Sequence, residues 1–323
     1  MMQLLAIGEC MIEMSGGEDG CWRLGFAGDT LNTLWYARAG LHPADGPVGY
    51  FTALGTDSFS DRIVDFLDEA GIASGAIRRI PNRRPGLYMI EQKDGDRAFT
   101  YWRDTSAARG LADDAEALRA AMRDARMIYL SGITLAILPA EGRARLLDAL
   151  RAAREGGARI AFDPNIRPAL WLDEVEMRDA ITAAAAISDI ALPSFDDEAR
   201  WIGDADPAAC ARRYAAAGSG EVVVKDGAGP VTILSEHAMT DMPVPPAAKV
   251  VDATGAGDSF VGGLIGYLAS QKGSVGKNLR AAIIHGTATA SFCCEGFGLQ
   301  KTTRIKKADI TKRVRELTRM VKW

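Results

Sequence analysis

The chain has 323 residues, of which 48% are apolar and 25% are charged, and its formal net charge is −4. These proportions are ordinary for a globular protein whose core is large enough to need no disulfide or metal. The weak negative charge gives no general affinity for nucleic acid or anionic membranes. The five cysteines form no CxxC pair and the three histidines lie far apart, which disfavours zinc sites and predicts reduced thiols.

The N-terminal segment Met1–Met14 carries Glu9 and Glu13 and no basic residue, so it is not typical of a signal peptide. No apolar run has the length of a membrane span, because Asp179 and Asp189 bracket the most apolar stretch. The sequence therefore predicts a cytoplasmic protein that does not bind membranes.

Short apolar runs alternate with stretches of helical periodicity along most of the chain. The runs are typical of buried strands, and the Ala- and Arg-rich stretches between them are typical of helices. This alternation predicts an α/β fold with a mostly parallel sheet, in a single domain that spans residues 1–323. The predicted strands are Leu4–Ile7, Met127–Leu130, Arg159–Phe162, Asp189–Leu192 and Val222–Lys225, and the clearest helices are Glu141–Glu155 and Ala208–Ala217.

Two segments of the N-terminal third interrupt this alternation. Cys21–Gly28 and Gly86–Asp104 are rich in aromatic and β-branched residues. In the second, a polar Asp-Gly turn at 93–96 separates Leu87–Gln92 from Arg97–Trp102, which is typical of a hairpin. We therefore expect a small sheet, built from about residues 9–28 and 86–104, that projects from the main domain.

The C-terminal segment Lys301–Trp323 contains nine Lys or Arg residues against two acids. Ile310, Val314, Leu317 and Val321 fall on one face of a predicted helix. An amphipathic helix packed on the core explains this pattern better than a nucleic-acid-binding arm does.

The strongest chemical signal is the segment Val251–Phe260, which reads VDATGAGDSF. Its glycines predict a tight turn, and a helix is expected to begin at about Asp258. Free N–H groups at a helix N-terminus bind anions and can stabilise a phosphoryl group in transfer. A carboxylate at the same place can accept the proton of an attacking hydroxyl. Taken alone, the segment would be better explained as a Gly-rich turn with an Asp cap and no chemistry.

Other nucleotide-binding signatures are absent. The chain has no GxxxxGK[ST] motif, and Phe260 stands where the dinucleotide fingerprint has its third glycine. Instead, Val251–Phe260 resembles the C-terminal signature of the ribokinase-like (PfkB) family of carbohydrate kinases. Gly25–Asn32 (GFAGDTLN) resembles the N-terminal signature of that family. The two signatures stand at opposite ends in the family's order, which is more specific than either alone.

This resemblance implies a ribokinase-like three-layer α/β/α sandwich. The projecting strands would form a β-sheet lid over the sugar, and in this family the lid is often also the contact of a homo-oligomer. ATP and Mg²⁺ are the implied cofactors, and a monovalent cation such as K⁺ is a further candidate. A nucleic-acid partner is not expected.

Within the family, six further segments are similar to those of 2-keto-3-deoxygluconate kinases. Two positions depart from the family pattern. Ala27 replaces a usual glycine, and Ser194 stands where Asn-x-x-Glu often lies near the magnesium, although Asp197 keeps the acid. The similar segments are Ile7–Glu13, Thr52–Ser60, Pro85–Tyr88, Tyr101–Arg103, Leu130–Ile133 and Asp163–Pro168.

The resemblance also implies roles for individual residues. Asp258 is the expected base, with the amides of Gly255, Ala256 and Gly257 around the transferred phosphoryl group and Asp197 near the metal. Part of Ile283–Gly298 should face the adenine. The expected sugar contacts are Gly28, Asn32, Tyr88, Tyr101, Arg103, Arg167 and Asp258. The expected nucleotide contacts are Asn165, Ser194, Lys225, Gly227, Gly255 and Gly257.

A keto-deoxy sugar acid has a carboxylate at one end and a primary hydroxyl at the other. The planar guanidinium of arginine pairs with a carboxylate through two hydrogen bonds, which makes Arg103 and Arg167 the candidate clamp. Each arginine could instead form a surface ion pair. Tyr88 and Tyr101 could serve only as cross-strand aromatics of the sheet.

The predicted reaction is ATP-dependent phosphorylation of the C6 hydroxyl of 2-keto-3-deoxygluconate to the 6-phosphate. The alternative is a fructokinase or another ribokinase-like sugar kinase. Neutral sugars do not need two arginines, so Arg103 and Arg167 distinguish these two functions. A catalytically idle sugar-binding protein on the same fold is disfavoured by the intact Asp258.

Overall fold

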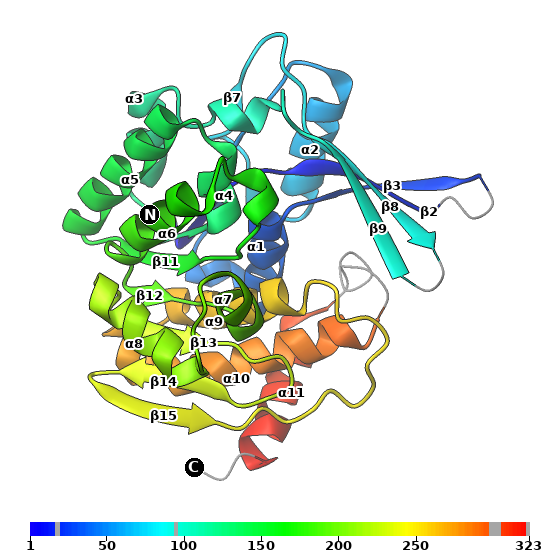
Figure 1. The fold of residues 1–323 in the computed structure, drawn as a ribbon. Coiled ribbons are helices and arrows are strands. Elements are labelled where there is room, and N and C mark those ends of the chain that lie inside the picture. The colour runs from blue at the N-terminus through cyan, green and yellow to red at the C-terminus, as the bar shows by residue number, and fades with distance from the viewer. Residues whose placement is uncertain (17–19, 94–95, 297–304, 321–323) are drawn as a thin grey trace.

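The computed structural model describes residues 1–16, 20–93, 96–296 and 305–320, and Figure 1 shows their arrangement. The main element is a nine-stranded sheet, which is parallel from β6 to β13 and antiparallel from β13 to β15. In spatial order its strands are β15 (Ala238–Met242), β14 (Val231–Ser235), β13 (Glu221–Val224), β12 (Ile190–Ala191), β11 (Arg159–Asp163), β10 (Met127–Ser131), β1 (Leu4–Ile7), β4 (Val48–Phe51) and β6 (Ile72–Ala73).

Helices cover both faces of this sheet. Side chains alternate between the faces along each strand, so one apolar strand contributes to a buried cluster on each face. In β1, Leu4 and Ala6 belong to one buried cluster, whereas Leu5 and Ile7 belong to another. The first cluster is closed by α1 (Asp29–Gly40), α2 (Ser58–Glu69), α9 (Ala256–Ser270), α10 (Val275–Cys294) and α11 (Lys307–Met320). The second is closed by α3 (Ala115–Met122), α4 (Gly132–Ile137), α5 (Ala140–Glu155), α6 (Glu174–Ala185) and α8 (Pro207–Ala217). The expected three-layer α/β/α sandwich is therefore confirmed.

A separate four-stranded sheet projects from the body of the molecule (Figure 1). Its order is β3 (Trp22–Ala27), β2 (Met11–Gly16), β8 (Leu87–Lys93) and β9 (Asp96–Trp102). Phe26 packs one face of this sheet against Phe66 of α2, with ring centroids 5.5 Å apart. Tyr88 and Tyr101 are cross-strand partners that line a pocket next to the other face. The expected projecting sheet is confirmed, although the Asp94-Gly95 turn lies outside the described residues.

Several boundaries differ from those predicted. Helix α9 begins at Ala256, two residues earlier than expected, and its N-cap residue Gly255 has φ 76°, a left-handed conformation that favours glycine. Strand β12 has only two residues where four were expected. The antiparallel pair β14 and β15 was not predicted, nor were the short parallel strands β5 (Ala53–Leu54) and β7 (Arg78–Arg79).

The C-terminal helix α11 is amphipathic as predicted. Ile310 and Leu317 are buried in the first core cluster, and Val314 packs against it, whereas Val321 lies outside the described residues. Within the described part of the chain, no helix combines the length and the apolar character that a membrane crossing requires.

Candidate active site

The candidate active site lies where several parallel strands end at one edge of the main sheet. Asp163 ends β11, and Asn165 and Arg167 follow it directly. Ser194 follows β12, and Lys225 follows β13. Ligands of open α/β sheets bind in the crevice outside the carboxyl ends of the strands. The loops that carry these five side chains therefore occupy the expected place for a ligand site.

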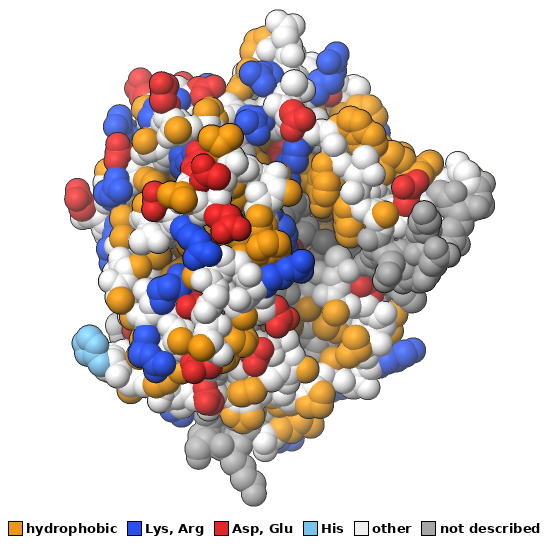
Figure 2. Space-filling model, in the orientation of Figure 1, with side chains coloured by type: hydrophobic (Ala, Val, Ile, Leu, Met, Phe, Trp, Pro, Cys, Tyr) orange, Lys and Arg blue, Asp and Glu red, His pale blue; other side chains and the backbone are white. Residues whose placement is uncertain are grey.

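A pocket of about 470 Å³ joins this edge to the first turns of α1 and α9 and to the small sheet. Its volume is in the range that encloses small-molecule ligands. Figure 2 shows the surface hollowed between the projecting sheet and the body of the molecule. The pocket is lined by Glu9, Met11, Gly28, Asp29, Asn32, Tyr88, Phe99, Tyr101, Arg103, Ile133, Asp163, Asn165, Arg167, Ser194, Asp197, Lys225, Thr254, Gly255, Gly257 and Asp258.

Asp258 sits in the first turn of α9, immediately after the glycine turn that opens this helix. The side chain of Asn32, from the first turn of α1, donates a hydrogen bond to it with Nδ2–Oδ2 2.9 Å. Burial raises the pKa of Asp258 to about 7, and the negative charge of Asp29 adds to this rise, while the Asn32 hydrogen bond opposes it. A carboxylate that titrates near neutral pH is a suitable general base.

A chain of polar contacts connects α1 to the ends of β11 and β13. The Nδ2 of Asn165 donates to Oδ2 of Asp29 at 2.9 Å, and its backbone N–H donates to Oδ1 of Asp163 at 3.0 Å. Lys225 completes the chain through an ion pair with Asp163, with Nζ–Oδ2 2.5 Å. The acids Asp29 and Asp163 therefore hold the side chains of Asn165 and Lys225, two of the residues that the sequence assigns to the nucleotide.

Arg103 enters the pocket from the small sheet already paired with an acid. Its Nε lies 3.0 Å from Oε2 of Glu9, and its Nη2 donates to the same oxygen. The other carboxylate oxygen of Glu9, Oε1, is buried and has no hydrogen-bond partner among the described residues. The guanidinium carbon of Arg103 lies 5.9 Å from the ring centroid of Tyr101. The ring of Tyr88 lies 5.7 Å from that of Tyr101, and its hydroxyl donates to Glu13.

Arg167 forms a second ion pair in the pocket, with Nη1–Oδ2 3.3 Å to Asp197. Burial raises the pKa of Asp197, while the positive charge of Arg167 opposes this rise. Ser194 is the N-cap residue of α7 (Phe195–Trp201) and Asp197 lies in its first turn, so both positions compared with the Asn-x-x-Glu pattern lie at the start of one helix. Hard cations such as Mg²⁺ prefer oxygen ligands, and Asp163 and Asp197 offer such oxygens at this edge.

The structure brings most of the sequence-predicted residues together in this one pocket. Of the individually predicted residues, only Ala256 and Gly227 are not among the lining residues, and none of the described residues 283–296 lines the pocket. The N–H of Ala256 donates to the carbonyl of Ala253 at 3.1 Å, which leaves the flanking Gly255 and Gly257 to face the cavity. Of the expected adenine segment, residues 297 and 298 lie outside the described residues.

The structure explains why glycine occupies position 28 and how alanine is tolerated at position 27. A Cβ on Gly28 would lie 2.0 Å from the carbonyl oxygen of Glu9, so the start of α1 approaches the connection between β1 and β2 too closely for any other residue. Ala27, which departs from the family pattern, is buried in a small cluster with Met11 and Tyr88. The extra methyl group is therefore accommodated in the cluster with Met11 of β2 and Tyr88 of β8.

Sequence reasoning missed several acids of the pocket. Glu9, Asp29 and Asp163 all lie inside segments that were recognised as family-like, but no role was assigned to them. Glu9 lies two residues after β1, Asp163 ends β11, and Asp29 begins α1 next to a glycine. That position at the carboxyl edge of the sheet is the signal that could have identified them.

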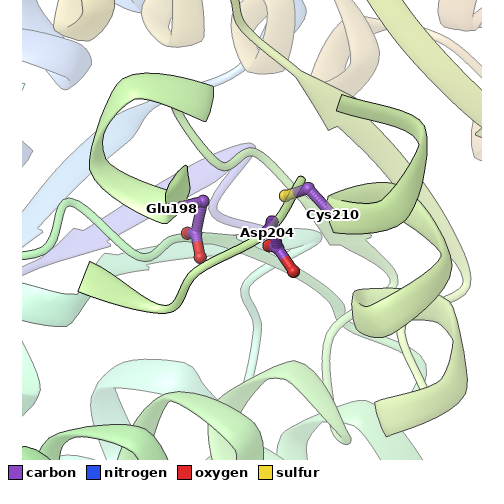
Figure 3. A group of neighbouring side chains, drawn as sticks. All are labelled: Glu198, Asp204 and Cys210. Atoms are coloured by element: carbon purple, nitrogen blue, oxygen red, sulfur yellow. The ribbon is translucent and has the colours of Figure 1, made fainter. Parts of the chain in front are cut away.

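A second cluster of potential metal ligands lies outside the pocket, between α7 and α8 (Figure 3). Within the described residues, Glu198, Asp204 and Cys210 offer ligand atoms within 4.8 Å of one another. The Nη2 of Arg213 lies 2.6 Å from Glu198 and 2.7 Å from Asp204. Because this guanidinium already supplies the positive charge, the cluster is an ion-pair network that joins two helices.

Comparison with known proteins identifies the class of protein that this fold and pocket define. Residues 1–306 match the model of the pfkB family of carbohydrate kinases. This chain belongs to the pfkB carbohydrate kinase family.

Two of its curated relatives carry the same name. A 2-dehydro-3-deoxygluconokinase of Dickeya dadantii is 42% identical over 266 residues, which cover 80% of this chain and 85% of that protein. The 2-dehydro-3-deoxygluconokinase of Escherichia coli K12 is 39% identical over 270 residues, which cover 81% and 87%. A crystal structure of a Xylella fastidiosa fructokinase with bound ATP superposes with a TM-score of 0.83 over 98% of this chain and all of the other, at 23% identity. This likeness shows the shared fold.

Proposed function

We propose that the protein is a 2-dehydro-3-deoxygluconokinase, which transfers the γ-phosphoryl group of ATP to the C6 hydroxyl of 2-keto-3-deoxygluconate. The observation that carries this proposal is the composition of the pocket. It places a carboxylate with a pKa near 7, Asp258, in the same cavity as two arginines, Arg103 and Arg167. The relatives of about 40% identity support the same substrate.

The reaction follows from the geometry around α9. Asp258 accepts the proton of the C6 hydroxyl while the new O–P bond forms and the bond between the γ-phosphorus and the ADP oxygen breaks. The N-terminus of α9, opened by Gly255, stabilises the negative charge on the phosphoryl oxygens. Asn32 keeps the carboxylate of Asp258 oriented through its 2.9 Å hydrogen bond.

The substrate carboxylate would bind between the two arginines. A guanidinium has five N–H donors, and Arg103 donates to Glu9 only through Nε and Nη2. Arg167 donates through its Nη1 to Asp197 and to the backbone carbonyl of Ile166. Both arginines therefore retain donors for a bidentate contact with the sugar acid, and their acidic partners fix their positions.

ATP with Mg²⁺ is the proposed cofactor. When bound, Mg²⁺ would supply positive charge against the ATP phosphates, and the carboxylate of Asp197 would help to hold it. Lys225 and Asn165 would contact the phosphates, held in place by Asp163 and Asp29. A requirement for K⁺ and a cytoplasmic location stay predictions.

A fructokinase is the second candidate, because it shares the fold and the base. The measurement that separates the two is a coupled assay of ADP release with 2-keto-3-deoxygluconate and with neutral hexoses. We expect the sugar acid to have the higher kcat/KM. A preference for fructose would contradict the proposal and would assign the two arginines to other roles.

We also propose that the small sheet mediates homo-oligomer formation. Strand β9 is an edge strand, and Phe99, Tyr101 and Trp102 on it are 43%, 50% and 54% exposed. Large exposed aromatic side chains at a free sheet edge favour association. Size-exclusion chromatography with light scattering should give a dimer or larger for the wild-type protein. Trp102→Glu changes the most exposed of these three side chains, leaves the pocket-lining Phe99 and Tyr101 in place, and should shift the protein toward the monomer.

A further inference from the structure

The first turn of α1 presents two polar side chains to the pocket, Asp29 and Asn32. They are three residues apart, so they lie on the same face of the helix. Asn32 donates to the base Asp258, and Asp29 accepts from Asn165, each at 2.9 Å. One helical turn therefore touches both the sugar side and the nucleotide side of the site.

Asn165 needs such an anchor because its backbone is strained. It is one of the few described non-glycine residues in the left-handed region, with φ 35°. Its backbone N–H is held by Asp163 and its side chain by Asp29. Without the contact to Asp29, the side-chain amide of Asn165 would have no hydrogen-bond partner among the described residues and could rotate.

Several groups surround Asp258 from the elements packed around it. Asp29 comes from α1, Tyr129 from β10, Asp163 from β11 and Lys225 from the end of β13. On the α10 side lies Cys293. Of these groups, Asp29 exerts the largest electrostatic effect on Asp258, and burial and Asp29 together raise its pKa.

We propose that Asp29 is a positioning residue of the phosphoryl-transfer site, which orients Asn165 through its hydrogen bond and strengthens Asp258 as a proton acceptor through its charge. This proposal rests on the proposed kinase function. The negative charges of Asp29 and of the base Asp258 repel each other, which is electrostatically unfavourable. The proposed role explains why an acid nevertheless stands next to Gly28.

Two substitutions separate the two parts of this role. Asp29→Asn keeps the size of the side chain and an oxygen that can accept from Asn165, but it removes the charge. Asp29→Ala removes both the charge and the acceptor. Asn165→Ala removes the hydrogen bond and keeps the charge. Glu141→Gln is the control, because Glu141 is also a first-turn helix carboxylate but lies outside the pocket.

The decisive measurement is the titration of the Asp258 carboxyl carbon by ¹³C NMR, with the resonance assigned by its loss in Asp258→Asn. In Asp29→Asn the titration should move to lower pH by on the order of 0.5–1 unit, because a like charge has been removed. In the pH profile of kcat/KM, the acidic limb should also move to lower pH. Asn165→Ala and Glu141→Gln should leave the titration in place, whereas Asp29→Ala and Asn165→Ala should both raise the KM for ATP.

A merely structural role of Asp29 would lower activity at every pH without moving the titration, and that result would overturn the proposal. An unchanged KM for ATP in Asp29→Ala would overturn the part that concerns Asn165. Thermal melts of all variants show whether each one is folded. The NMR titration needs no substrate, so absence of activity on sugar acids would contradict the proposed function alone.

Discussion

The guanidinium of Arg103 and the carboxylate of Glu9 form a buried ion pair at the base of the small sheet. The two side chains are only 10% and 1% exposed, and the second oxygen of Glu9 has no hydrogen-bond partner among the described residues. Removing one member of a buried ion pair leaves an uncompensated charge and costs about 3–5 kcal/mol of stability. A test of Arg103 as a substrate ligand must therefore also neutralise Glu9.

We predict that the double variant Glu9→Gln with Arg103→Met loses activity selectively toward sugar acids. Loss of a charge-assisted hydrogen bond, about 1.5–3 kcal/mol, should lower kcat/KM for 2-keto-3-deoxygluconate by about 10- to 150-fold. A neutral ketose should be affected little, because it has no carboxylate. The measurement is the ratio of kcat/KM for acid over ketose in the variant and in the wild type.

The single variant Arg103→Met should show the same fall in this ratio and, in addition, a lower melting temperature, because Glu9 stays buried without its partner. Arg151→Met is a suitable control, since Arg151 pairs with Asp148 on the surface. An unchanged ratio in the double variant would show that Arg103 does not bind the substrate carboxylate. That result would favour the fructokinase alternative.

We predict that Asp258→Asn lowers turnover by about 10²-fold or more, the usual effect of losing a general base. Binding of sugar and ATP should change little, because the new side chain has nearly the same shape and its oxygen can still accept from Asn32. Single-turnover kinetics and calorimetric binding measurements separate the two effects. Turnover close to that of the wild type would remove Asp258 from the mechanism.

The same substitution should stabilise the protein above neutral pH. The pKa of Asp258 is raised to about 7 in the folded state, whereas in the unfolded state it is about 4. Between these pH values the folded state keeps the proton of Asp258 and the unfolded state has lost it. Stability from this group is therefore present at low pH and is lost as the pH rises toward 7. Melting temperatures should show a larger gain for Asp258→Asn at pH 8 than at pH 5. An equal gain at both pH values would contradict the assigned pKa.

The fold could be predicted from sequence wherever local periodicity determines the structure. The runs at Leu4–Ile7 and Met127–Leu130 are apolar on both faces, which only a central strand covered by helices on both sides explains. The pairing of β2 with β8, which are parallel neighbours, could not be predicted. These strands are separated by about seventy residues, and nothing in either one indicates its partner.

The site was predictable as far as its residues belong to recognisable turns. The glycine turn before Asp258 and the Gly28 junction are local features, and both open onto the same pocket. The partners of the predicted residues were not predictable, because Glu9 with Arg103 and Asp29 with Asn165 are contacts between distant segments. Such contacts require the three-dimensional arrangement of several strand ends.

We predict that activity requires Mg²⁺ and that Asp197 contributes to its binding. Excess chelator should abolish turnover, and Asp197→Asn should raise the Mg²⁺ concentration needed for half-maximal activity. Asp196→Asn is the matched control, because Asp196 is the neighbouring carboxylate but is exposed and does not line the pocket. Full activity in excess chelator, or equal Mg²⁺ requirements of the two variants, would contradict this assignment.

The last prediction uses the two glycines that flank Ala256 at the start of α9. Gly255 has φ 76°, so Gly255→Ala forces an L-residue into the left-handed region, which costs about 1–2 kcal/mol of stability. A Cβ on Gly257, in contrast, would meet no protein atom within 4 Å. Because alanine favours helix over glycine, Gly257→Ala should fold as well as the wild type or up to about 1 kcal/mol better.

Gly257 lines the pocket, so its new methyl group would occupy space where the transferred phosphoryl group is expected to lie. We therefore predict that Gly257→Ala, though stable, loses at least about tenfold in kcat, because small displacements of reacting groups are costly. Chemical denaturation measures the stabilities, and steady-state kinetics measure the turnover. A Gly257→Ala variant that is as active as the wild type would show that the phosphoryl group passes elsewhere. In that case the N-terminus of α9 would not be the anion-binding element of this kinase.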